Sequence, residues 1–130
     1  MDYGLQINLL HSLLIGPFLV WTGYKLNTNQ SLSGLEKLVM LIIGMSVIVF
    51  HGWKAVQHQL AGDSILSNYG FQINMLHFLF IGPLIAWVGY KLYKDKSPTD
   101  LEKTTLLVLG IIALVYHAFN AFKKYNSQQS

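Results

Sequence analysis

Four histidines of this chain lie within long apolar segments, where an ionisable side chain needs a specific reason to be present. His11 and His77 occupy the matching segments INLLHSLLIG and INMLHFLFIG, while His51 and His117 occupy GMSVIVFHGW and GIIALVYHAF. A neutral imidazole can bind zinc, copper, nickel or iron, can serve as an axial ligand of haem, and can exchange protons near neutral pH. We therefore take these four histidines as the candidate site, with metal ligation as one of its chemistries.

Other residues on the same helical faces would support such a site. Gly44 precedes His51 by two helical turns, and Gly110 precedes His117 in the same way. A small residue at such a position lets two helices approach closely, or leaves a slot for a flat ligand such as haem. The polar side chains that we expect to support the histidines are those of Asn8, Asn74, Gln6 and Gln72.

Two prolines interrupt the apolar segments that contain His11 and His77. Pro17 and Pro83 each follow a glycine. Because proline has no backbone N–H, each should kink its helix and leave the carbonyl oxygen four residues earlier, that of Leu13 or Leu79, without a donor. These carbonyl oxygens are candidate polar groups near the centre of a bilayer.

The elements that must position these residues are four apolar helices. Hydrophobic residues make up 52% of the 130 residues and charged residues only 12%, about half the charged share of an average soluble domain. Each apolar segment approaches the roughly 20 residues that a membrane-spanning helix requires. The sequence predicts transmembrane helices at about Leu5–Leu26, Leu35–His58, Phe71–Tyr93 and Leu101–Lys124.

The chain also contains an internal repeat. Residues 3–58 recur without a gap as residues 69–124, so that YGLQINLLH is followed later by YGFQINMLH. We expect two two-helix repeats, 1–58 and 69–124, a linker at 59–68 and a flexible tail at 125–130. The predicted fold is an all-α integral membrane protein, in which two antiparallel helical hairpins are related by a pseudo-twofold axis along the membrane normal.

In such hairpins the four histidines should share one depth. His11 and His51 are equally far from residue 31, the centre of the first hairpin, and His77 and His117 are equally far from residue 97. Because all helical residues rise by the same step, the four imidazoles should form one layer toward the side of the chain termini. His58 has no histidine counterpart, since Lys124 takes its place, and we interpret it as a surface residue.

Charge and composition limit the partners. The net charge is +3 and every basic residue is a lysine, without the basic patch and stacking aromatics that nucleic acid requires. Lysines are more frequent at the hairpin loops, which favours loops in the cytoplasm and both termini on the opposite side. The expected partners are the lipid bilayer and further copies of this chain, because two hairpins alone enclose little interior.

Three functions fit these observations. The leading one is a small membrane transport or conductance protein, with a four-histidine site for a transition metal ion or for protons. The first alternative is a single-haem b-type redox protein with histidine axial ligands. The second is a structural membrane protein without chemistry. The chain has no cysteine and no carboxylate pair suited to acid–base catalysis, so we do not expect an enzyme that works without a bound cofactor.

Overall fold

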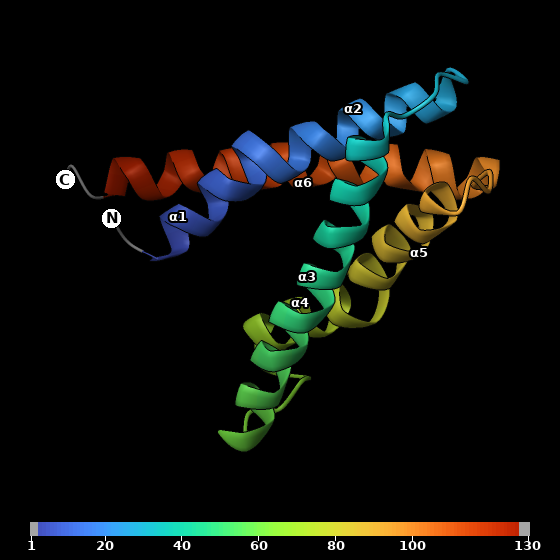
Figure 1. Ribbon diagram of the computed structural model, residues 1–130. Helices are drawn as coiled ribbons and strands as arrows, with labels where there is room; N and C mark the ends of the chain where they lie inside the picture. Colours follow the sequence, from blue (N-terminus) through green and yellow to red (C-terminus); the bar gives the residue numbers. More distant parts are fainter. Residues whose placement is uncertain (1–2, 128–130) are drawn as a thin grey trace. The chain divides into compact units, whose positions relative to one another are not determined.

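The computed structural model describes residues 3–127, and within this range the chain forms helices and no strand. The elements are α1 (Tyr3–Leu10), η1 (His11–Ile15), α2 (Gly16–Asn27), α3 (Gly34–Leu60), α4 (Tyr69–Leu76), η2 (His77–Ile81), α5 (Gly82–Tyr93) and α6 (Asp100–Ser127) (Figure 1). The two η elements are π-helical turns inside otherwise continuous helices. Residues 125–127 belong to α6, and the rest of the expected tail lies outside the described residues.

The four long helices confirm the sequence prediction. They span Tyr3–Asn27, Gly34–Leu60, Tyr69–Tyr93 and Asp100–Ser127, with 25, 27, 25 and 28 residues, and each is long and apolar enough to cross a membrane. Large apolar side chains in the middle of these helices point outward. Leu13 is 72% exposed and Val49 is 68% exposed, as expected of surfaces that contact lipid rather than water.

Local sequence signals set where two of the helices begin. The Ser33 hydroxyl accepts a hydrogen bond from the Glu36 N–H at 3.2 Å, and the Glu36 carboxylate accepts one from the Ser33 N–H at 2.6 Å. Thr99 and Glu102 form the same pair of bonds before α6, at 3.2 Å and 2.6 Å. Each capping box satisfies two N–H groups that the first helical turn leaves without a partner, so α3 and α6 start at defined residues.

The helices form two compact units. Unit 1 contains α1, η1 and α2 with α6, and unit 2 contains α3 with α4, η2 and α5. Within each unit the long helices run antiparallel (Figure 1). The sequence predicts that the two helices of each copy pack together as a hairpin. In the structure, the helices that pack together are different ones: each unit combines the first helix of one copy with the second helix of the other.

Glycines explain this choice of neighbours in unit 1. A Cβ atom added to Gly16 would lie 2.9 Å from the Leu114 Cα, and one added to Gly23 would lie 2.7 Å from the Leu107 Cα. On the opposite helix, a Cβ on Gly110 would lie 2.7 Å from the Val20 N. The backbones of α2 and α6 therefore approach more closely than any larger residue would allow, which lets many atoms make van der Waals contact.

Unit 2 uses the corresponding glycines. A Cβ on Gly89 would lie 2.6 Å from the Leu41 N, one on Gly82 would lie 2.8 Å from the Ile48 Cγ1, and one on Gly44 would overlap the backbone of Ala86. Gly44 and Gly110 thus serve close helix packing, the first of the two roles that the sequence suggested. The space expected for a flat ligand beside them is filled by the neighbouring helix.

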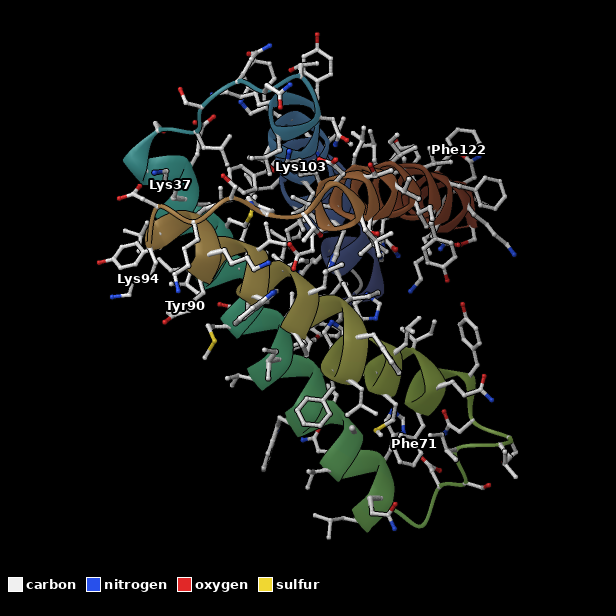
Figure 2. All side chains as sticks on the ribbon, turned by 90° about the vertical axis from the view of Figure 1, so that its right-hand side faces the viewer. Lys37, Phe71, Tyr90, Lys94, Lys103 and Phe122 are labelled. Carbon is white, nitrogen blue, oxygen red and sulfur yellow. The ribbon has the colours of Figure 1, made fainter. Side chains whose placement is uncertain are left out.

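The two ends of unit 2 differ in chemistry. Figure 2 shows Lys37 and Lys94 at one end and Phe71 toward the other. At the lysine end, the Lys37 ammonium donates a 2.6 Å hydrogen bond to the carboxylate of Asp95. This bond and the positive charge of Lys37 hold the pKa of the Asp95 carboxyl below its usual value. We call the opposite end, where α3 ends and α4 begins, the linker end.

Candidate functional site: two histidine pairs

The structure brings the four candidate histidines together as two pairs, one in each unit. In unit 1 the rings of His11 and His117 stack with centroids 4.3 Å apart and planes 27° from parallel. In unit 2 the rings of His51 and His77 stack at 4.3 Å and 24°. Each pair joins one histidine from each sequence copy. In place of one layer of four histidines, the structure shows two separate pairs with similar stacking geometry.

One histidine of each pair is held by the backbone of its own helix. His11 Nδ1 lies 2.8 Å from the Ile7 carbonyl oxygen, and His77 Nδ1 lies 2.8 Å from that of Ile73. A carbonyl oxygen can only accept a hydrogen bond, so Nδ1 is the protonated ring nitrogen in both side chains. These bonds fix both the tautomer and the direction of each ring.

The other histidine of each pair is held by an asparagine of the facing helix. His117 Nδ1 lies 2.8 Å from the Asn8 Oδ1, and His51 Nδ1 lies 2.8 Å from the Asn74 Oδ1. The asparagine amides are themselves oriented, because each Nδ2 donates a 2.7 Å bond to the carbonyl oxygen four residues earlier, that of Gly4 or Gly70. The predicted supporting role of Asn8 and Asn74 thus has a definite geometry, although each supports the histidine of the other sequence copy.

This arrangement gives all four imidazoles the same chemical state when they are neutral. Nδ1 bears the proton and donates it to a fixed oxygen, so Nε2 is the basic nitrogen. Such an oxygen acceptor on one ring nitrogen is the usual device by which proteins orient a histidine whose second nitrogen does chemistry. His51 is only 9% exposed, and His11, His77 and His117 are half-buried.

A π-helical turn follows the first histidine of each pair. The Gly16 N–H donates to the His11 carbonyl oxygen, five residues earlier, instead of to that of Ser12. Because Pro17 has no N–H, the carbonyl oxygens of both Ser12 and Leu13 lose the donor that an α-helix would provide. Beside the proline the structure therefore has a π-helical turn, in which two carbonyl oxygens, rather than the one expected, lose their α-helical N–H donor.

The same turn occurs in unit 2. There the Gly82 N–H donates to the His77 carbonyl oxygen, and Pro83 follows. The flanking side chains differ, since buried Ser12 in unit 1 corresponds to Phe78 in unit 2. Helices with π-helical turns are often associated with functional sites, and here both turns begin at a candidate histidine.

The remaining predicted polar residues lie outside the pairs. Gln6 is exposed on α1, and the Gln72 amide donates a 3.3 Å bond to the Leu66 carbonyl oxygen in the linker. Among residues 3–127, no three histidine, cysteine or carboxylate side chains gather as metal ligands would.

The stacking geometry restricts what each pair can bind. The lone pair of Nε2 lies in the plane of its ring, and a metal ion must sit near that plane at about 2.0–2.1 Å from nitrogen. Two nearly parallel planes whose rings are 4.3 Å apart offer no point that satisfies this condition for both nitrogens. A haem cannot lie between the two rings either, because the rings stack directly on each other with centroids 4.3 Å apart. A proton, in contrast, needs only one of the two nitrogens.

The fifth histidine, His58, which the sequence suggests is a surface residue, also has a defined environment. His58 Nδ1 lies 2.6 Å from the Asp63 Oδ2, and the His58 ring stacks on Phe71 with centroids 5.4 Å apart and planes 13° from parallel. Its side chain is 25% exposed. The signal in the sequence was a carboxylate five residues after the histidine, across the end of a helix, where the chain can fold back.

Comparisons of this chain with protein-family models, with curated proteins and with solved structures found no match.

Proposed function

We propose that this protein is a small integral membrane protein that transports or conducts protons, and that its two histidine pairs are the proton-binding sites. One observation supports this most directly. All four imidazoles present a fixed Nδ1–H to an oxygen acceptor, and each ring stacks on a second imidazole. Each pair therefore combines two basic Nε2 nitrogens in a largely apolar setting.

Each pair should hold one proton at a time. A proton that binds one Nε2 produces an imidazolium, whose charge is shared with the acceptor on Nδ1 and lies over the neutral partner ring. A second proton would place two positive charges in stacked rings, which strongly disfavours its uptake. One proton per pair is thus the stable charged state, and release of that proton regenerates the neutral pair.

The transition-metal and haem functions predicted from the sequence are weaker proposals. Either would require at least one imidazole of a pair to rotate out of the stack, and that rotation would break its bond to Ile7, Ile73, Asn8 or Asn74. Proton binding needs no such movement.

We further propose the membrane arrangement that the sequence predicts. The four apolar helices cross the bilayer, the two repeats are related by a pseudo-twofold axis along the membrane normal, and the hairpin loops face the cytoplasm. The exposed apolar side chains contact lipid and further copies of the chain.

Proton flux into liposomes tests this function. Purified protein is reconstituted with a pH-sensitive dye inside, and a potassium gradient with valinomycin drives proton entry. The matched variants replace histidine by asparagine, whose amide can still donate from the Nδ1 position but has no basic Nε2. We expect wild-type flux above that of empty vesicles, reduced flux in H11N/H117N and in H51N/H77N, and none in the quadruple variant.

Folding of the variants is checked by helix content and by thermal unfolding in detergent. Wild-type flux equal to that of empty vesicles would reject proton conduction. Undiminished flux in a folded quadruple variant would reject the histidine pairs as its sites. Insensitivity of the wild-type flux to EDTA is expected, because no metal takes part.

A further inference from the structure

We infer that His58 and Asp63 form a proton-collecting dyad at the linker end of unit 2, which supplies the His51–His77 pair from the water on that side. This inference rests on the proposed function and deepens it, because it names the group through which one of the two sites meets bulk water.

The dyad has the geometry of a proton-exchanging histidine. Asp63 accepts the Nδ1–H of His58 at 2.6 Å, so Nε2 is the basic nitrogen and the one that can take a proton. The stack on Phe71 holds the ring in place. With the two side chains 25% and 34% exposed, the dyad meets water on one side and the helix packing on the other.

The dyad is also linked structurally to the His51–His77 pair. His58 follows His51 by two helical turns on the same face of α3, about 10 Å along the axis. Gly70 of α4 lies beside the dyad, since an added Cβ there would be 3.5 Å from the His58 Nε2. The Gly70 carbonyl oxygen accepts from Asn74, and Asn74 in turn accepts the Nδ1–H of His51. Gly70, whose carbonyl oxygen orients Asn74, thus borders the dyad.

Unit 1 lacks this feature at the corresponding position. Lys124 stands where His58 would be, and an ammonium has no lone pair with which to receive a proton. The other charged group on the last turns of α3 is Lys54, four residues before His58. The positive charge of Lys54 repels other cations and attracts anions. The carboxylate of Asp63 offsets that charge at the dyad.

The transfer is a sequence of balanced proton exchanges. A hydronium ion or a protonated buffer gives its proton to the His58 Nε2 and leaves as water or as the free base. The His58 imidazolium then gives its Nε2 proton to the nearest of a file of water molecules, each water passes one proton to the next, and the last water releases one proton to an Nε2 of the His51–His77 pair. His58 returns to its neutral form with Nδ1–H on Asp63.

The test uses the full chain in liposomes, with the unit 1 pair inactivated by H11N/H117N so that flux depends on unit 2. In this parent, H58N keeps a donor toward Asp63 but removes Nε2. We expect a several-fold fall in flux at low buffer concentration, and recovery when millimolar imidazole is added as a mobile proton donor. The matched control is K124N in the H51N/H77N parent, where we expect unchanged flux.

Each result decides the matter. Equal flux in H58N and its parent would overturn the dyad, as would a loss of flux that added imidazole does not restore, because that pattern indicates a structural role. A parent without any flux, or a quadruple asparagine variant with full flux, would instead overturn the proposed function itself. The two failures are therefore distinguishable.

Discussion

At the scale of single residues, the two asparagines set the direction of the histidines they face. Asn8 and Asn74 each accept from a histidine ring and donate to a backbone carbonyl within their own helix. The asparagine is thus held in one orientation of its amide. The loss of either bond leaves a polar group without a partner, and this is costly in a low-dielectric environment.

Replacing Asn74 by alanine should therefore destabilise the protein and release the His51 ring. We expect a loss of about 1–3 kcal/mol in the free energy of unfolding, the cost of leaving a buried donor unsatisfied. Denaturant unfolding in detergent measures the stability, and ¹⁵N NMR of labelled histidine measures the tautomer. Wild-type stability together with an unchanged Nδ1–H signal for His51 would contradict this role.

The Lys37–Asp95 pair gives a pH-dependent prediction outside the histidine site. Its hydrogen bond and charge lower the pKa of Asp95, so the pair stabilises unit 2 above the pKa of the unfolded state. That small contribution is lost as the pH falls through the lowered pKa of the folded state. In K37M the pKa of Asp95 should rise toward its ordinary value, which an NMR titration of its carboxyl carbon can follow. An identical titration in K37M would contradict the assignment.

At the scale of elements, the Gly-Pro sequence sets the backbone beside each pair. The π-helical turn exists because glycine donates five residues back while the following proline cannot donate at all. The turn begins at the histidine itself, so its geometry determines where the first ring of the pair projects.

Replacing Pro17 by alanine restores an N–H donor for the Leu13 carbonyl oxygen. We expect the turn at His11–Ile15 to convert to α-helix, which would rotate His11 relative to His117 and weaken their stacking. The ¹³C shift of the Leu13 carbonyl and the ring shifts of His117 report the two changes. P83A should do the same in unit 2. Retention of the wild-type shifts in P17A would show that proline does not maintain the turn.

The close helix packing makes a separate prediction about glycine. Replacing Gly110 by valine places two methyl groups against the backbone of Val20, and we expect destabilisation of about 1–3 kcal/mol or more from overpacking. The matched control is G34A, since a Cβ at Gly34 meets nothing within 4 Å. Thermal unfolding of both variants provides the comparison, and equal stability of G110V and G34A would contradict the packing.

At the scale of the whole molecule, the apolar composition and the length of four segments were sufficient to predict four membrane-length helices. The rarity of ionisable groups within apolar segments identified the four histidines. The choice of neighbours could not be predicted, because it depends on which glycine faces which backbone. For the same reason the expected slot beside Gly44 was replaced by contact with Ala86.

The pairing of His58 with Asp63 could not be predicted from the sequence either. His58 differs from its counterpart Lys124, and a residue without a repeated partner gave no reason to look further. Its function depends on Asp63, which approaches only because the linker turns back over the end of α3. Contacts of this kind require the path of the loop, which composition and periodicity do not specify.

The measurement that tests the central claim most directly is a pH titration of ¹⁵N-histidine-labelled protein in lipid bilayers by solid-state NMR. Above the titration range, we predict that all four paired histidines are neutral with the proton on Nδ1. Upon acidification each pair should take up one proton before any pair takes up two, with the new proton on Nε2. Four independent titrations, or neutral rings protonated on Nε2, would contradict the account.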